Sequence, residues 1–142
     1  PEGDHVVPIG KAAVARNGDD LTIVATAKML PATLEAAEEL FSSGISVEVI
    51  DPRTLSPLDV GTIVNSVKKT TRLILVHEAV EQGGIGAEIA TRVQKETFYY
   101  LDSPVARVAA PFAPVPASPA LENSFVPTKV EIIRAVQLAL NR

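Results

Sequence analysis

The sequence contains no cysteine among its 142 residues. This absence excludes disulfides, thiol catalysis and metal sites with cysteine ligands. Basic residues form no run and the net charge is −4, so nucleic acid is a poor partner. No apolar stretch approaches the ~18–20 residues that span a bilayer, so we expect no membrane partner. The two histidines, His5 and His77, make a poor metal set on their own.

What is present is typical of a globular chain, with 46% hydrophobic and 21% charged residues. A chain of this length fits one domain and can bury ~68–70% of its unfolded surface. We therefore predict a single domain over residues 1–142, with a leading linker at 1–10 and a proline-rich loop at 110–127. The first residues read PEGDHVVPIGKA without an initiator methionine, which suggests a segment of a longer protein or a processed chain.

Strand-like and helix-like segments alternate along the sequence. Residues 11–25 read as two strands around Asn17-Gly18, a dipeptide that favours a tight antiparallel hairpin. Further strands are expected within 45–51, 72–78 and 105–109. This alternation predicts an α/β fold, a three-layer sandwich with a mostly parallel sheet, one antiparallel edge strand and helices on both faces.

Apolar spacing and capping residues mark the expected helices. The first is expected to end at Gly44 and carries apolar residues at helical spacing: Leu30, Leu34, Ala37 and Phe41. The second is expected to begin with Ser56 as its cap and Pro57 in its first turn. Thr128 and Glu131 form a capping box for the last helix. Its inward residues are expected to be Val130, Ile133, Val136 and Leu140.

A glycine loop formed by Gly83, Gly84 and Gly86 lies between the apolar run LILV and a predicted helix. Its spacing matches neither the dinucleotide fingerprint nor the phosphate-binding loop with Gly-Lys-Ser/Thr. Helix N-termini attract anions in general, so phosphate binding is kept as an alternative. We favour a structural interpretation, in which the glycines permit positive φ angles and a close approach of helix to sheet.

Glu78 lies near the carboxyl end of a predicted strand, where open α/β sheets usually place ligands. Adjacent strand residues point to opposite faces, so His77 and Glu78 are not expected to act as an acid–base pair. We expect Glu78 to accept hydrogen bonds from the backbone of the glycine loop. Arg53 is expected to form an ion pair with Asp51 or Asp59 that pins its loop, and anion binding is the alternative. These residues alone indicate no catalytic, cofactor-binding or metal site.

Three motifs, RTLSPLD, HEAVEQGGIGAE and LDSPVARV, occur in an order and spacing that carry a family resemblance. The chain resembles the C-terminal domain of the beta subunit of thiamin-diphosphate-dependent 2-oxoacid dehydrogenases, within the transketolase C-terminal domain superfamily. Pyruvate, branched-chain 2-oxoacid and acetoin dehydrogenases are its near relatives. The resemblance runs from about Pro8 to the end. The chain departs from the family pattern at Pro52, usually Leu, and at Phe112, near a position that is often Asp.

The resemblance implies a non-catalytic assembly and partner-docking domain of an oxidoreductase. The intact enzyme would decarboxylate a 2-oxoacid and reductively acylate a lipoyl group, with thiamin diphosphate and Mg²⁺ bound outside this domain. The implied partners are the alpha subunit and second beta subunit of a heterotetramer, and the subunit-binding domain of the lipoyl acyltransferase.

By the same resemblance, Asp102 and the terminal carboxylate of Arg142 match the docking groups of the relatives, and the glycine loop lies near a subunit contact. The implied location is the bacterial cytoplasm or, in a eukaryote, the mitochondrial matrix. The alternative hypothesis is an independent anion- or nucleotide-binding α/β domain.

Overall fold

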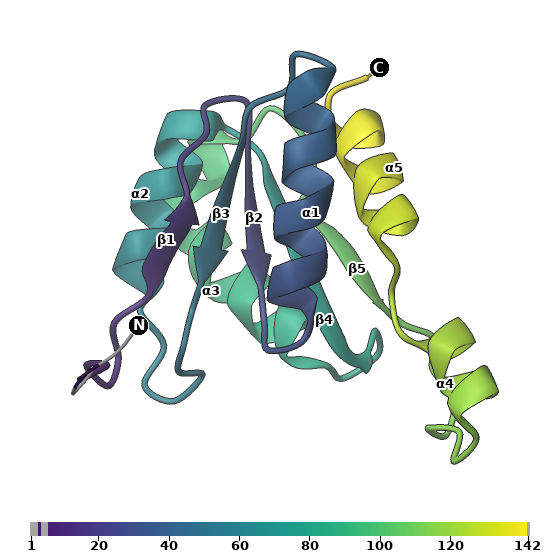
Figure 1. Ribbon diagram of the computed structural model, residues 1–142. Coiled ribbons are helices and arrows are strands. Elements are labelled where there is room, and N and C mark those ends of the chain that lie inside the picture. The colour runs from purple at the N-terminus through teal and green to yellow at the C-terminus, as the bar shows by residue number, and fades with distance from the viewer. Residues whose placement is uncertain (1–2, 4–5, 142) are drawn as a thin grey trace.

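A five-stranded sheet forms the centre of the molecule (Figure 1). The computed structural model describes residues 3 and 6–141. The spatial order of the strands is β1-β3-β2-β4-β5. Their bounds are β1 (Ala13–Arg16), β2 (Leu21–Ala25), β3 (Val47–Asp51), β4 (Leu73–Val80) and β5 (Ala106–Ala110). The last four strands run parallel, and β1 lies antiparallel to β3 at one edge. The predicted fold class is therefore confirmed.

Helices cover both faces of this sheet. On one face lie α1 (Met29–Ser42) and α5 (Lys129–Ala139), and on the other lie α2 (Val60–Thr70) and α3 (Ile85–Thr97). Every residue of β2 is buried, as a parallel strand covered on both faces requires. Ile23 enters the core beneath α1 and α5, while its neighbour Val24 enters the core beneath α2 and α3. Within the described part of the chain, no helix is long and apolar enough to cross a membrane.

The predicted hairpin between the first two strands is wrong, because β1 pairs with β3 and not with β2. The connection between β1 and β2 instead wraps around the start of β3. The backbone N–H groups of Asp19 and Asp20 both donate to the carbonyl of Ser46, at 3.0 and 2.8 Å. Gly18 is needed for this close approach, since a Cβ there would lie 2.1 Å from the carbonyl carbon of Val47. The dipeptide Asn17-Gly18 thus serves a contact distant in sequence, not a tight turn.

The predicted cap of α2 is also wrong. The helix begins at Val60, and its cap is Asp59, whose Oδ1 accepts from the backbone N–H of Thr62 at 3.2 Å. The other oxygen of Asp59 accepts from the backbone N–H of Ala12 at 3.1 Å, just before β1. A carboxylate can make both bonds because it has two acceptor oxygens, whereas the hydroxyl of Ser56 has one.

The C-terminal third differs from the prediction in two places. The expected loop at 110–127 contains a short helix, α4 (Pro119–Phe125), which lies away from the layers in Figure 1. The capping box of Thr128 and Glu131 is confirmed. On α5, three of the predicted inward residues do face the core, namely Ile133, Val136 and Leu140. The fourth is wrong, because Val130 is exposed and Ile132 is fully buried.

We expect Gly18→Ala to lower the free energy of unfolding by on the order of 2–3 kcal/mol, because the new methyl group would overlap the backbone of β3. Gly61→Ala, on α2, is the matched control. Its methyl group would lie 3.7 Å from Asp59 Oδ1, an ordinary contact, so it should stabilise the helix by about 0.5–1 kcal/mol. Urea unfolding of the two variants measures both. Equal stability of Gly18→Ala and the parent would contradict the wrapped connection.

Candidate functional site

The glycine loop at the carboxyl end of β4 is filled by the ring of His77, which is 2% exposed. A Cβ on Gly86 would lie 2.3 Å from Nε2 of that ring, and a Cβ on Gly84 would lie 2.9 Å from its Cε1. Gly83 has a φ of +78° and open space around it, so it makes the turn. The ring occupies the side of the loop that the two bare glycines leave open.

The ring of His77 is held as a neutral group. Its Nδ1 lies 2.9 Å from the carbonyl oxygen of Ala79, which requires the proton on Nδ1 and leaves Nε2 as an acceptor. Nε2 is buried and has no hydrogen-bond partner among the described residues. Burial lowers the pKa of His77, and the charge of Arg107 adds to this effect, while the bond to Ala79 and the charge of Glu81 oppose it. The neutral, enclosed imidazole packs the loop from within.

The expected hydrogen bonds from the glycine loop to Glu78 are not formed among the described residues, and that side chain is only partly buried. Other groups hold the loop. The backbone N–H of Glu81 donates to the carbonyl of Ala110 at 2.9 Å. Arg107 donates to the carbonyl of Glu81 at 2.7 Å and lies 3.5 Å from its carboxylate. These contacts fasten the loop to β5. The sequence analysis did not predict a contact between these two segments.

Arg53 also differs from its predicted role, because it forms no ion pair within residues 3 and 6–141. Its backbone N–H donates to Asp51 Oδ1 at 2.9 Å, and its φ is +56°. Asp59, the other expected partner, caps α2 instead. The side chain of Arg53 is exposed and lines a cavity at the carboxyl ends of β2 and β3.

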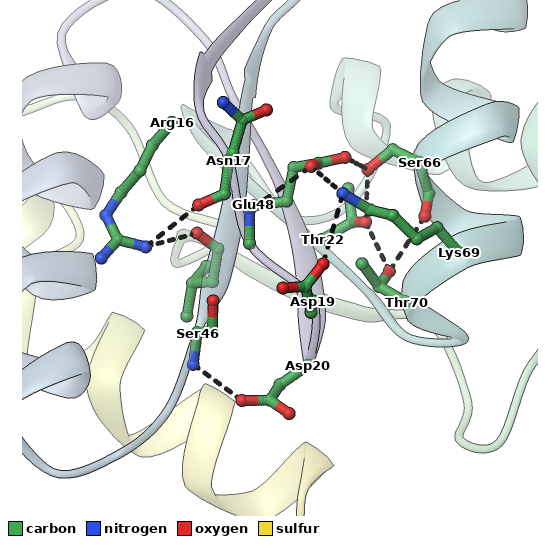
Figure 2. A network of polar contacts seen from close by, with 12 residues as sticks. Arg16, Asn17, Asp19, Asp20, Thr22, Ser46, Glu48, Ser66, Lys69 and Thr70 are labelled. Carbon is green, nitrogen blue, oxygen red and sulfur yellow. Dashed lines mark hydrogen bonds and ion pairs between the residues drawn. The ribbon is translucent and has the colours of Figure 1, made fainter.

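The densest polar cluster surrounds Glu48 and was missed by the sequence analysis (Figure 2). Glu48, the second residue of β3, is charged and yet only 4% exposed. Its carboxylate accepts from Ser66 and Lys69 on α2, and from the backbone N–H of Gly18 at 3.4 Å. The one available signal was a glutamate inside the apolar segment ISVEVI. A charge at that position is stable only when it is paired.

The cluster has no free nucleophile. The hydroxyl of Ser66 is already engaged by Glu48 and lies 2.6 Å from Thr22 Oγ1, which in turn lies 2.6 Å from Thr70 Oγ1. Burial alone would raise the pKa of Glu48, but the hydrogen bonds from Lys69, Ser66 and Gly18 outweigh it and hold that pKa below its ordinary value. The carboxylate is therefore ionised at neutral pH, and the cluster is a structural network.

Asp102 lies at the opposite end of the strands from the glycine loop, beside the start of β4. Its Oδ2 accepts from Thr71 Oγ1 at 2.7 Å and lies 3.6 Å from the guanidinium of Arg72. The side chain of Asp102 remains 58% exposed. Arg72 also donates to the carbonyl of Ala139 at 3.2 Å, which brings the end of α5 to the same place.

A hollow of about 420–430 Å³ lies on each side of the turn that carries Asp102. Asn141 lines one of them together with Asp102. Arg142, the other expected docking residue, lies outside the described residues. The described end of the chain and Asp102 thus share one surface.

The described residues do not fit thiamin diphosphate or its Mg²⁺. Across residues 3 and 6–141, no three His, Asp or Glu side chains are grouped so that they could hold a metal ion. The glycine loop, the one candidate for a diphosphate, is filled by the ring of His77. That this domain binds no cofactor stays a prediction.

Comparison with known proteins identifies the family. The family model described as transketolase, C-terminal domain, matches residues 10–132. The chain belongs to this family. It is 44% identical over 133 residues to the beta subunit of acetoin:2,6-dichlorophenolindophenol oxidoreductase from Bacillus subtilis, covering 94% of this chain and 39% of that protein.

Two further relatives agree with this assignment. The chain is 46% identical over 141 residues to the mitochondrial pyruvate dehydrogenase E1 component subunit beta-1 of Arabidopsis thaliana, covering 99% of this chain and 39% of that protein. A solved structure, a split-gene transketolase in an inactive beta4 tetramer, superposes with a TM-score of 0.79 at 30% identity, covering 97% of this chain and 44% of its own. The transketolase C-terminal domain chain described here thus spans about two fifths of the curated relatives' length.

We expect Glu48→Gln to lower the free energy of unfolding by about 2 kcal/mol at pH 7, because it removes the charge that the surrounding donors stabilise. The folded-state pKa of Glu48 is depressed, so its contribution is present above the unfolded pKa of about 4.5 and is lost as pH falls through the folded value. The difference between parent and variant should therefore shrink below pH ~4.5. Denaturant unfolding at pH 7 and pH 3 measures it. Glu96→Gln, at an exposed position on α3, is the control and should change neither value.

We expect Gly86→Ala to destabilise the domain by about 1–3 kcal/mol, because the buried ring of His77 cannot move away from the new methyl group. In the background of His77→Ala, the same change should cost at least ~1 kcal/mol less, since the ring is gone. A double-mutant cycle by thermal unfolding measures the coupling. Gly61→Ala combined with His77→Ala should be additive, and additivity for Gly86 as well would contradict the packing role of the loop.

Proposed function

We propose that this chain is the assembly and docking domain of the beta subunit of a 2-oxoacid or acetoin dehydrogenase. The observation that carries the proposal is the match of nearly the whole chain to beta subunits of acetoin- and pyruvate-oxidising enzymes. If its substrate is a 2-oxoacid, the intact enzyme would be an oxidoreductase that decarboxylates this acid and passes the acyl group to a lipoyl carrier. Relatives from bacteria and from mitochondria support a place in the bacterial cytoplasm or the mitochondrial matrix.

The chemistry of such an enzyme would lie outside this chain. The described residues supply no metal-binding group of carboxylates and no open glycine loop. Thiamin diphosphate and Mg²⁺ would therefore be held by the remainder of the beta subunit and by the alpha subunit. The alternative of an independent nucleotide-binding domain is disfavoured by the same filled loop.

The subunit would associate with a second copy of itself within a heterotetramer. Support comes from the split-gene transketolase, whose beta chains assemble as a beta4 tetramer and whose domain superposes on this one. We therefore propose that this chain also takes part in contacts between beta subunits.

The surface around Asp102 would dock the subunit-binding domain of the lipoyl acyltransferase. Asp102 is fixed by Thr71 yet more than half exposed, so it can accept a further charged hydrogen bond at little cost in ordering. The end of the chain shares this surface, so the terminal carboxylate of Arg142 would add a second negative group. Arg72 lies 3.6 Å from the carboxylate of Asp102 and already neutralises part of its charge. A basic group of the partner would therefore have to approach this carboxylate more closely than Arg72 does.

We expect Asp102→Asn to weaken binding of the isolated subunit-binding domain to the intact heterotetramer by roughly 1–3 kcal/mol, because one charged acceptor is lost. Surface plasmon resonance measures the affinity, and the loss should lie mostly in the off-rate. Glu38→Gln, an exposed change on α1, is the matched control and should leave the affinity as it was. Unchanged affinity for Asp102→Asn would remove Asp102 from the docking surface.

A further inference from the structure

The residue that ends α2 has an unusual backbone conformation. Thr71 caps the helix with a φ of +60°, in the left-handed region. Glycine and asparagine are the residues that usually adopt this conformation at a helix end, and Gly44, with a φ of +80°, follows α1 in this way. Among residues 3 and 6–141, four residues other than glycine have a positive φ, and Thr71 is the one whose side chain is branched at Cβ. For such a side chain the left-handed region is strained.

A set of hydrogen bonds holds Thr71 in this conformation. Its backbone N–H donates to the carbonyl of Val67 at 2.8 Å, and its own carbonyl accepts from the backbone N–H of Asp102 at 2.9 Å. Its hydroxyl donates to Asp102 Oδ2 at 2.7 Å and accepts from the guanidinium of Arg72 at 3.3 Å. A strained residue persists only where its surroundings fix it, and such residues cluster at functional sites.

The end of α2 does not itself require a threonine. Glycine at position 71 would keep the backbone bond to Val67 and would adopt the same φ without strain. What glycine would lack is the hydroxyl, and that hydroxyl is engaged by Asp102, 31 positions away in the sequence. The threonine therefore serves the contact with Asp102.

The side-chain contacts that Asp102 makes within the chain converge on one of its two oxygens. Oδ2 accepts from Thr71 and lies 3.6 Å from the guanidinium of Arg72, whereas Oδ1 has no hydrogen-bond partner among the described residues. The side chain remains 58% exposed, so the carboxylate can be approached from outside the chain. A side chain that is oriented in advance loses less conformational freedom when a partner binds it.

We propose that Thr71 is a positioning residue for docking: its strained conformation presents the hydroxyl that orients the carboxylate of Asp102 toward a basic group of the partner. The partner is the one already proposed for this surface, the subunit-binding domain of the lipoyl acyltransferase. The inference therefore rests on the proposed function, and it names how the docking site is prepared. Thr71 acts through Asp102 and does not itself touch the partner.

Three substitutions in the intact heterotetramer separate positioning from a structural role. Thr71→Gly and Thr71→Val both lack the hydroxyl, so each should weaken binding of the isolated subunit-binding domain by about three- to tenfold in surface plasmon resonance. Thr71→Gly should nevertheless melt at a higher temperature than Thr71→Val in scanning calorimetry, because only glycine relieves the strain. Thr71→Ser keeps the hydroxyl and should bind to within twofold of the parent.

Two controls accompany these variants. Thr91→Val makes the same change at an exposed position on α3, where the hydroxyl bonds only to the carbonyl of Ala87 in its own helix, and it should bind like the parent. In the background of Asp102→Asn, Thr71→Gly should weaken binding by less than twofold, because the charged acceptor that it orients is already absent.

Four results would overturn the role of Thr71: binding like the parent by Thr71→Gly and Thr71→Val, binding by Thr71→Ser as weak as theirs, a melting temperature of Thr71→Gly below that of Thr71→Val, or an undiminished loss in the Asp102→Asn background. Size-exclusion chromatography checks that each variant assembles. If Thr71→Val does not, Thr71→Ala replaces it, because alanine lacks both the hydroxyl and the branch at Cβ. Parent-like binding by Asp102→Asn would contradict the docking function itself, so the two failures are distinguishable.

Discussion

The buried carboxylate of Glu48 is the interaction on which the order of the strands depends. It lies on β3 and binds the connection between β1 and β2 through Gly18, and the helix α2 through Ser66 and Lys69. These three segments are distant in sequence, and a charge among them is stable only when each supplies a donor. The same arrangement lets β3 lie between β1 and β2, with the connection passing closely over its start.

The two ends of the parallel strands are specialised differently. At the carboxyl end, where enzymes of this fold class place their ligands, the glycine loop is closed by His77 and the remaining hollow is largely apolar. At the amino end, Asp102 and the end of α5 form a polar surface.

Local patterns in the sequence predicted most of the fold. The alternation of strands and helices, the capping box at Thr128 and the turn after α1 at Gly44 all depend on neighbours within a few residues. The errors came from distant contacts. Asn17-Gly18 has the local signature of a hairpin. Gly18, however, must lack a side chain because the backbone of Val47, 29 positions away, lies against it. Likewise, Asp59 and not Ser56 caps α2, and the same carboxylate binds Ala12, 47 positions away.

The candidate site was harder to predict for the same reason. Arg53 and Asp59 are close in sequence, yet Asp59 is committed to α2, which leaves Arg53 without the expected partner. The loop after β4 was expected to be held by Glu78, but a bond to β5 and the ring beneath the loop hold it instead. Neither β5 nor the orientation of that ring can be read from residues 77–88 alone.

The length of β4 has a consequence for how a larger assembly would be put together. Its eight residues separate the Asp102 surface from the glycine loop at the other end of the strand by roughly 25 Å. At physiological ionic strength, charges are screened over about 8 Å. A partner bound at one end should therefore not change the affinity for a partner at the other end. The equilibrium constant for binding both partners should then be the product of the two separate binding constants. Such a subunit could join its partners in any order, with no obligatory intermediate.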